Sequence, residues 1–284
     1  MRLVVQSSGI NGSLITYSHL AHIHQLCGTS IQFVQTAEHA YYLANQAVAI
    51  PEVLQFCVDQ HIDCAYVQDI QILKNFGLCV MDMDSTLISI ECIDEIADMI
   101  SIKPQIAAIT ERAMLGELDF AQSLRERVAL LKGLKESDLM RVLNERLTLN
   151  PGATDWIAAC KKHNIKTLLV SGGFTFFADR VKAMLGLDHA VSNTLEIVDG
   201  KLTGNILGNI VDAQTKADAL TKLRDKLGLT KAHTIAIGDG ANDLKMMAAA
   251  GISIAYHAKP IVQAQATYAL NYVGLDGAIG LLSL

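Results

Sequence analysis

The sequence predicts an α/β protein with a Rossmann-like parallel-sheet core, a helical cap inserted after the first core strand, and a small N-terminal α/β domain. Short, fully apolar runs alternate with amphipathic segments after about residue 75. A purely helical stretch over about residues 91–147 separates the first two of these runs. Residues 1–74 differ in character, because strand-like and helix-like pieces alternate loosely there. These three observations define the fold class.

Composition limits the class of protein further. The chain has 284 residues, of which 51% are hydrophobic, so a large core is available. No apolar run approaches the roughly 18 residues of a membrane span, and the first residues turn polar too early for a signal peptide. We therefore expect a cytoplasmic protein without a membrane partner. A net charge of −6 without a Lys or Arg cluster argues against a nucleic-acid partner, and six cysteines without a CxxC pair fit a reducing compartment.

The individual elements follow from the local patterns. Within residues 1–74 the pieces RLVVQ, SIQFVQT, PEVLQFCVDQ and DCAYVQ indicate strands and a helix. Four apolar runs, at 78–81, 166–170, 233–238 and 251–256, predict parallel strands covered on both faces. The helical insert is much longer than an ordinary crossover and therefore predicts a separate lobe. Asp199-Gly200 predicts a hairpin turn.

Acidic residues stand where two of these strands end. Asp82 and Asp84 follow the first core strand, and Asp239 and Asp243 follow the strand at 233–238. Ligands of open parallel sheets bind outside the carboxyl ends of the strands, so we expect the four carboxylates to converge. Two like charges about 4 Å apart repel by about 4 kcal/mol at an effective dielectric near 20, and a bound cation reverses this repulsion. Because the ligands are oxygen atoms only, we expect a hard ion, Mg²⁺.

The acidic motifs also have three simpler explanations, namely a solvated loop, an EF-hand and a nucleotide P-loop. A solvated acidic loop explains either motif alone, but it explains both motifs at strand ends poorly. An EF-hand loop beginning at Asp82 requires glycine and glutamate at the positions of Leu87 and Ile93. No GxxxxGK[ST] motif occurs, which excludes a nucleotide P-loop.

Two further features suit an anionic ligand. Ser171 ends the second core strand and is followed by Gly172, Gly173 and an expected helix start, where a hydroxyl and free backbone N–H groups bind anions. An ordinary Ser-Gly-Gly turn is the alternative. Lys216 lies near another helix start, where its charge opposes the helix dipole by roughly 0.3–1 kcal/mol. This misfit favours a phosphate partner, although an exposed lysine is the commoner outcome at such a position.

The helical insert contains an arginine on an apolar face. Arg127 shares one helical face with Phe120, Leu124 and Leu131, whereas Arg125 does not. Its guanidinium either extends along the apolar surface to solvent or binds a carboxylate with two N–H groups. Glu91, taken alone, is an acid in a first helical turn, where it is favourable to the helix dipole.

Four motifs in the expected order resemble the haloacid dehalogenase superfamily: DMDST at 82–86, SGG at 171–173, Lys216, and GDGAND at 238–243. Longer stretches such as ITERAMLGELDFAQSLRERVALLKG and NTLEIVDGKLTGNI resemble its branch that acts on O-phospho-L-serine, and the resemblance covers about residues 76–275. It implies a sheet core of the haloacid dehalogenase type. It also implies a Mg²⁺-dependent hydrolase that releases L-serine and phosphate from O-phospho-L-serine, the last step of L-serine biosynthesis, through an aspartyl-phosphate.

The resemblance assigns catalytic and metal roles to the acidic residues. It implies that Asp82 is the nucleophile and that Asp84 is the general acid and base. It implies that Mg²⁺ is held by the carboxylates of Asp82 and Asp239 and by the backbone carbonyl of Asp84. Asp243 and Asn242 are expected behind these ligands.

Substrate-binding roles also follow from the resemblance. It implies that the phosphoryl oxygens are bound by Ser171, the Gly172 amide and Lys216. For the serine part of the substrate it implies Arg127 at the carboxylate, Glu91 at the ammonium, and Met114 and Phe120 as pocket walls.

Alternatives remain open at this point. The fold and chemistry also suit another small phosphate ester, such as phosphohomoserine or phosphoethanolamine, or a phosphotransfer. Residues 1–74 exceed the shortest members of the family, so an amino-acid-sensing regulatory protein with secondary catalysis is the alternative from another class. Longer members carry N-terminal regulatory ACT domains, and an ACT-like domain is the expectation for residues 1–74, although no motif there supports it. A homodimer is also compatible with the sequence.

Overall fold

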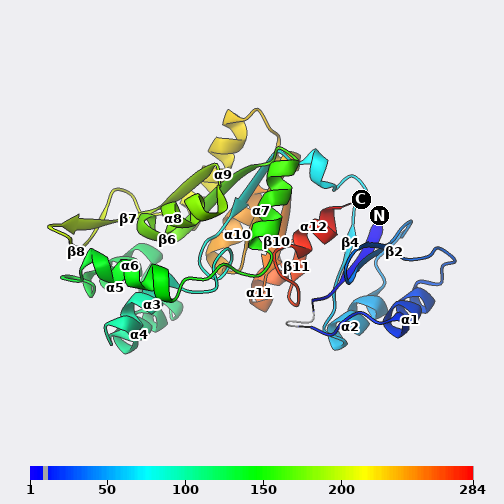
Figure 1. The fold of residues 1–284 in the computed structure, drawn as a ribbon, viewed down its shortest axis with the longest axis horizontal. Coiled ribbons are helices and arrows are strands. Elements are labelled where there is room, and N and C mark those ends of the chain that lie inside the picture. The colour runs from blue at the N-terminus through cyan, green and yellow to red at the C-terminus, as the bar shows by residue number, and fades with distance from the viewer. Residues whose placement is uncertain (9–11, 284) are drawn as a thin grey trace.

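The computed structural model describes residues 1–8 and 12–283 and shows an elongated molecule with three parts in a row (Figure 1). A helical lobe lies at one end, a large sheet flanked by helices lies in the middle, and a small sheet with two helices lies at the other end. The expected domains, 1–74 and 75–284, include residues 9–11 and 284, which lie outside the described residues.

The small N-terminal part has the element order βαββαβ. Its sheet has the order β2-β3-β1-β4 with antiparallel pairing throughout, which is the ferredoxin-like arrangement. Strand β3 was missed by the sequence analysis, because four residues after a tight turn leave almost no pattern to detect. The elements are β1 (Arg2–Gln6), α1 (Tyr17–Cys27), β2 (Val34–Ala37), β3 (Ala40–Leu43), α2 (Pro51–Asp59) and β4 (Asp63–Val67).

The central sheet has seven strands in the order β11-β10-β9-β5-β6-β7-β8. Its neighbouring strands pair in parallel, as predicted, except for the antiparallel hairpin β7–β8. That hairpin turns at Asp199 and Gly200, both with positive φ, as expected. The strands are β5 (Leu78–Met81), β6 (Lys166–Phe174), β7 (His189–Val198), β8 (Lys201–Leu207), β9 (Thr234–Gly238), β10 (Ile252–Tyr256) and β11 (Tyr268–Leu270).

Helices cover both faces of this sheet, and two separate apolar cores result. Strands β5, β9 and β10 are buried on both faces because their side chains alternate between these cores, whereas β7 and β8 are only partly buried. The helices of this part are α7 (Ala153–Lys162), α8 (Thr175–Leu185), α9 (Ala213–Lys226), α10 (Leu244–Ala249), α11 (Pro260–Gln263) and α12 (Gly277–Leu282). Short 3₁₀ turns lie at η1 (Leu73–Asn75), η2 (Lys231–His233) and η3 (Ala241–Asp243).

The helical cap follows β5, as predicted. It consists of α3 (Cys92–Met99), α4 (Lys103–Met114), α5 (Phe120–Ala129) and α6 (Glu136–Glu145). The β7–β8 hairpin packs against it, since backbone hydrogen bonds join Leu202 to Gly133 and Leu134. None of the helices in the described ranges has the length and apolar character needed to cross a membrane.

The chain enters and leaves the cap through two adjacent segments. Ile88 and Leu149 form an antiparallel bridge, and the Asn150 N–H donates to the Leu87 carbonyl oxygen. The Asn150 side-chain amide donates to the carbonyl oxygens of Ser85, Thr86 and Ile88 at 3.2, 2.8 and 3.1 Å. These bonds stabilise the loop after Asp82, in which Ser85 has a positive φ.

Buried polar contacts join the N-terminal part to the end of the chain. The Asp63 carboxylate accepts backbone N–H groups of Asn271, Tyr272 and Val273 at 2.8, 2.8 and 3.0 Å. The buried Gln6 amide donates to the Gly277 carbonyl oxygen at 3.0 Å. The segment 271–277 is therefore bound directly to the N-terminal sheet.

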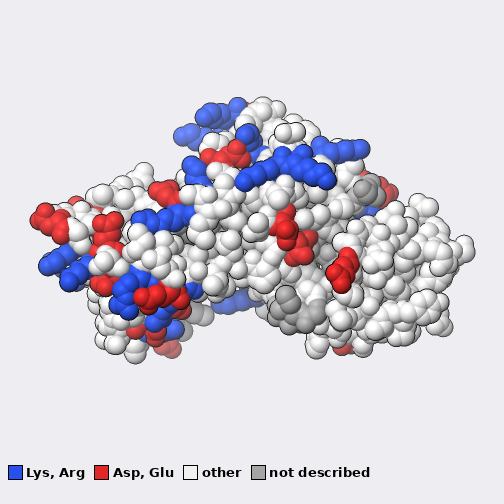
Figure 2. All heavy atoms as spheres, in the orientation of Figure 1, with Lys and Arg blue, Asp and Glu red and all other residues white. Residues whose placement is uncertain are grey.

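Charge is distributed unevenly over these parts. Residues 1–73 contain one Lys or Arg, Arg2, and its side chain is buried. On the face drawn in Figure 2, Lys and Arg lie over the central sheet and the cap, while the N-terminal part is almost free of them. The sites that attract anions are thus expected in the central part and the cap.

We predict that Asp63→Ala lowers the free energy of unfolding by roughly 2–4 kcal/mol, because three backbone N–H groups lose a charged acceptor. Denaturant unfolding followed by circular dichroism measures this loss. Asp59→Ala, which changes an exposed acid of the same domain, serves as the control. A loss for Asp63→Ala no larger than that of the control would contradict a supporting role of this carboxylate.

Candidate active site

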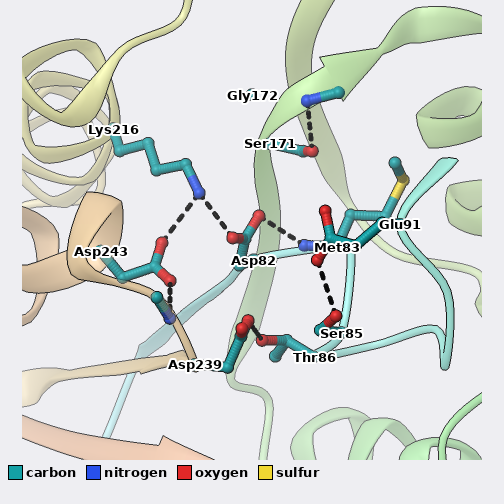
Figure 3. Close-up of polar contacts among 12 residues, drawn as sticks. Asp82, Met83, Ser85, Thr86, Glu91, Ser171, Gly172, Lys216, Asp239 and Asp243 are labelled. Carbon is teal, nitrogen blue, oxygen red and sulfur yellow. Dashed lines mark hydrogen bonds and ion pairs between the residues drawn. The ribbon is translucent and has the colours of Figure 1, made fainter. Parts of the chain in front are cut away.

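Adjacent parallel strands bring the two acidic motifs together, as the sequence predicted. Strands β5 and β9 are neighbours, with Met81 paired to Ile237, and the Asp82 N–H donates to the Ile237 carbonyl oxygen at 3.0 Å. Asp82 and Asp239 therefore lie next to each other just beyond the ends of their strands (Figure 3). This edge of the sheet faces the cap.

Three of the four predicted carboxylates form one cluster. Asp82, Asp239 and Asp243 each place an oxygen within 4.8 Å of those of the other two. Lys216, from α9, lies against this cluster with its side chain 1% exposed. Its Nζ lies 2.7 Å from Asp82 Oδ2 and 2.8 Å from Asp243 Oδ1 (Figure 3). In the sequence Lys216 suggested a phosphate partner, and in the structure it pairs with two carboxylates.

The cluster carries more negative charge than Lys216 neutralises. Burial and the charge of Asp82 raise the pKa of Asp239 to about 6. The same causes raise the pKa of Asp243 to about 7, although Lys216 acts in the opposite direction. Burial alone would lower the pKa of Lys216, but the charges of Asp82 and Asp243 outweigh it and raise that pKa. The Lys216 ammonium thus pairs with two of the three carboxylates.

The donor set fits a hard divalent cation. Asp239 forms no ion pair within the described residues, and its Oδ1 accepts one hydrogen bond, from Thr86 Oγ1 at 2.8 Å. Among the described residues, no histidine nitrogen or cysteine sulfur belongs to this group of possible ligands. Oxygen-only sites of this kind select hard ions, whose charge would remove the repulsion within the cluster.

The fourth carboxylate, Asp84, does not join the cluster, so the prediction that all four converge is wrong for this side chain. The loop turns at Ser85, which has a positive φ, and strand alternation does not continue to Asp84. A Cβ on Gly173 would meet Asp84 Oδ2 at 2.8 Å, so this carboxylate faces the Ser-Gly-Gly segment. Burial, then the charges of Glu91 and Asp82, raise the pKa of Asp84 well above its ordinary value.

The Ser-Gly-Gly segment differs in detail from the expectation. Strand β6 continues to Phe174, and α8 begins only at Thr175, so Ser171 and Gly172 do not form the first turn of that helix. The Gly173 N–H donates to Ser171 Oγ at 2.8 Å. A Cβ on Gly172 would meet the Phe120 ring of the cap at 3.0 Å. Glycine at 172 and 173 therefore allows the close approach of the cap and of Asp84.

A pocket of about 720 Å³ lies between the cap and the carboxyl ends of the strands. It is lined by the two aspartates of the first motif, by Asp239 and Asn242, and by the segment 171–174. The cap contributes the four side chains predicted for it, namely Glu91, Met114, Phe120 and Arg127. The structure thus brings the predicted substrate-binding residues of the cap to one cavity with Ser171 and Gly172, whereas Lys216 lies behind Asp82 and is not among the lining residues.

The acid and the base of the cap differ in their contacts. Glu91 precedes α3 without capping it, and its Oε1 accepts a hydrogen bond from Ser85 Oγ at 2.7 Å. Burial raises the pKa of Glu91. Arg127 donates from Nε to the Ser123 carbonyl oxygen at 3.3 Å and has no carboxylate within ion-pair distance among the described residues. Its other N–H groups are available to an anionic ligand.

Three residues near the site were not identified from the sequence. Thr86 donates to Asp239, Ser85 donates to Glu91, and Lys259 lines the pocket just before α11. The hydroxyls of Thr86 and Ser85 directly follow the first acidic motif, which is a usable signal. Nothing in the sequence around Lys259 links it to the other segments, because only the tertiary fold brings them together.

A capped parallel sheet with clustered aspartates and a buried lysine at the strand ends defines a hydrolase class. The chain belongs to the haloacid dehalogenase-like hydrolase family, which matches residues 79–248. A Haemophilus influenzae protein named phosphoserine phosphatase is 45% identical over 278 residues, which are 96% of this chain and 87% of that protein. The resemblance found in the sequence motifs is therefore confirmed.

Solved structures agree with this assignment. The unliganded crystal structure of a probable phosphoserine phosphatase from Vibrio cholerae has a TM-score of 0.86 and 41% identity, covering 99% of this chain and 85% of that chain. A phospho-aspartyl intermediate analogue of phosphoserine phosphatase has a TM-score of 0.68 and 38% identity, covering 73% of this chain and 99% of that chain.

We predict that Mg²⁺ stabilises the chelator-treated protein and that Asp239→Asn removes this effect. At a concentration 100 times Kd, binding to the folded state adds about 2.7 kcal/mol to the free energy of unfolding. Thermal unfolding with and without Mg²⁺ measures the gain. Asp199→Asn, at the hairpin turn, is the matched control and should keep it. An equal gain in Asp239→Asn and the control would exclude this cluster as the metal site.

Proposed function

We propose that this protein is a phosphoserine phosphatase that hydrolyses O-phospho-L-serine to L-serine and phosphate. The observation that carries the proposal is the arrangement around Asp82, whose carboxylate faces both the ammonium of Lys216 and a pocket lined by Arg127 and Glu91. Relatives that carry this name match almost the whole chain.

Asp82 acts as the nucleophile. Its Oδ1 accepts the Met83 N–H at 2.7 Å and its Oδ2 contacts Lys216 at 2.7 Å, so the carboxylate is held in one orientation at the strand end. An oxygen of Asp82 forms a bond to phosphorus while the bond from phosphorus to the serine oxygen breaks. In the second step, water attacks the phosphorus of the aspartyl-phosphate and the Asp82 carboxylate is released.

Asp84 transfers the protons of both steps. Its raised pKa, caused by burial and by the charges of Glu91 and Asp82, favours the protonated form that the first step requires. It donates that proton to the departing serine oxygen, and in the second step it accepts a proton from the attacking water. The position of Asp84 outside the carboxylate cluster suits proton transfer, because its carboxyl group is not needed to bind a cation.

The phosphoryl group is bound by three donors from two elements, β6 and α9. Ser171 Oγ, the Gly172 N–H and Lys216 Nζ bind the phosphoryl oxygens and stabilise the charge that spreads over them. In support, Ser171 and Gly172 line the pocket beside Asp82, and Lys216 Nζ lies 2.7 Å from Asp82 Oδ2. Asp82, Asp239 and the backbone carbonyl of Asp84 would hold Mg²⁺, with Asp243 and Asn242 behind them, and the ion would supply positive charge that neutralises part of the phosphoryl charge.

The cap recognises the amino-acid part of the substrate. Arg127 presents free N–H groups to the substrate carboxylate, and Glu91 presents an oxygen to its ammonium. Met114 and Phe120 form apolar walls beside them. An acid and a base in one pocket select a zwitterion over a simple phosphate ester.

The proposal also includes a role for the N-terminal domain, the location of the protein and its oligomeric state. The ferredoxin-like order of residues 1–74 supports a regulatory, ACT-like role for this domain. A cytoplasmic location and a homodimer complete the proposal.

We predict that Asp82→Asn lowers kcat at least about 1,000-fold, since the nucleophile is lost while the size of the side chain is kept. Phosphate release from phosphoserine in the presence of Mg²⁺ measures this loss, and circular dichroism verifies the fold. A kcat within tenfold of the original would eliminate Asp82 as the nucleophile.

We predict that Arg127→Ala raises KM for phosphoserine about 10–100-fold, because charge-assisted hydrogen bonds to the substrate carboxylate are lost. Hydrolysis of p-nitrophenyl phosphate should change less than about threefold. Arg125→Ala, on the exposed side of the same helix, is the matched control. Equal losses on both substrates would show that Arg127 is structural, and phosphoethanolamine turnover equal to that of phosphoserine would reject the carboxylate contact.

A further inference from the structure

The β6–β7 pairing is interrupted beside the phosphoryl-binding segment. Val170 pairs with Val191, and the next pair is Phe174 with Asn193. Four steps along β6 thus face two steps along β7, and Ser171, Gly172 and Gly173 fall in the interruption. A regular ladder does not fix the orientation of these peptide groups.

Asn193 supplies hydrogen bonds where the ladder is missing. Its side chain is buried, at 1% exposure, and its Nδ2 donates to the Gly172 carbonyl oxygen at 2.8 Å. Its Oδ1 accepts the Val211 N–H, also at 2.8 Å. Because one partner is an acceptor and the other is a donor, the two ends of the amide cannot be exchanged.

The first of these bonds acts on Ser171 through the peptide group between Gly172 and Gly173. The carbonyl oxygen of that peptide is bound by Asn193, and its N–H donates to Ser171 Oγ at 2.8 Å. Because Ser171 Oγ accepts the Gly173 N–H, its own hydrogen must point away from Gly173. The buried Ser171 lines the pocket, so its hydrogen is available to a phosphoryl oxygen.

The second bond fixes the start of α9. Val211 precedes Asp212, whose side chain caps this helix by accepting the Thr215 N–H at 2.8 Å. One turn further along, Lys216 contacts Asp82. A single buried amide therefore joins the segment that carries Ser171 to the helix that carries Lys216.

We propose that Asn193 is a positioning residue for the phosphoryl site, which orients the Gly172–Gly173 peptide and thereby Ser171. This inference rests on the proposed function as far as phosphoryl transfer is concerned, but it does not depend on serine as the leaving group. Asn193 does not line the pocket, and the bond by which it acts on Ser171 is the one to the Gly172 carbonyl oxygen.

The test is a double-mutant cycle of Asn193→Asp and Ser171→Ala. Asn193→Asp keeps an acceptor for the Val211 N–H and removes the donor to Gly172. Removal of one oxyanion donor lowers kcat about 100- to 1,000-fold. Replacement of a residue that acts through such a donor should lower kcat/KM about 10- to 100-fold. Phosphoserine and p-nitrophenyl phosphate serve as substrates, and inorganic phosphate serves as a competitive inhibitor.

We expect Asn193→Asp to lose about 10- to 100-fold on both substrates and to bind inorganic phosphate correspondingly more weakly. In the double variant, the loss should exceed that of Ser171→Ala by no more than about threefold, since both changes remove one interaction. Gln6→Glu is the matched control, because Gln6 is a buried amide that donates to the Gly277 carbonyl oxygen far from the pocket. It should remain within about twofold of the original activity.

Two results would overturn the inference. One is activity of folded Asn193→Asp within about twofold of the original, and the other is a double variant whose loss equals the product of the two single losses. If Asn193→Asp does not fold, Asn193→Ser takes its place in the double-mutant cycle, because a serine side chain is too short to reach both partners. The same two results in that variant would overturn the inference. A protein that cleaves p-nitrophenyl phosphate but not phosphoserine would contradict the proposed substrate and leave this cycle fully measurable.

Discussion

The contact of Lys216 with Asp82 and Asp243 is the interaction on which the site depends. A parallel sheet delivers side chains to one edge, and here that edge receives three carboxylates within 4.8 Å of one another. Buried charges of one sign destabilise a fold unless they are paired. The buried ammonium of Lys216 compensates part of the negative charge, and a hard cation would compensate the rest. The surrounding elements hold these groups in place, since an aspartate caps the helix that carries Lys216.

The cluster was predictable from the sequence because the prediction required only that the two strands run in the same direction. Asp82 and Asp239 follow strands of the same sheet, and strands of one direction end at one edge. Asp84 departed from the expectation because β5 ends at Met81, so the backbone that carries Asp84 belongs to a loop. The rule that alternate residues share a face holds within a strand, and β5 ends before either aspartate.

Other parts of the site depend on residues that are distant in the chain. Thr86 and Asp239 are separated by 153 positions, and their hydrogen bond exists only because β5 and β9 are neighbours. Asn193 likewise lies 21 positions from Gly172 and acts where two strands lose register. Local periodicity identifies strands and helices, but it contains no information about such irregularities. The helices of the cap were predictable because their signal is local, since the apolar positions repeat within each segment.

The segment 271–277 is shared by two parts of the molecule. Its backbone is bound by Asp63 of the N-terminal sheet, and the Leu275 N–H donates to the carbonyl oxygen of Pro151, directly after the chain returns from the cap. A truncation that begins at the central sheet would leave three amides of this segment without their acceptor and would free the neighbour of Pro151 to shift. The N-terminal sheet is therefore connected, through this segment, to the point where the chain returns from the cap.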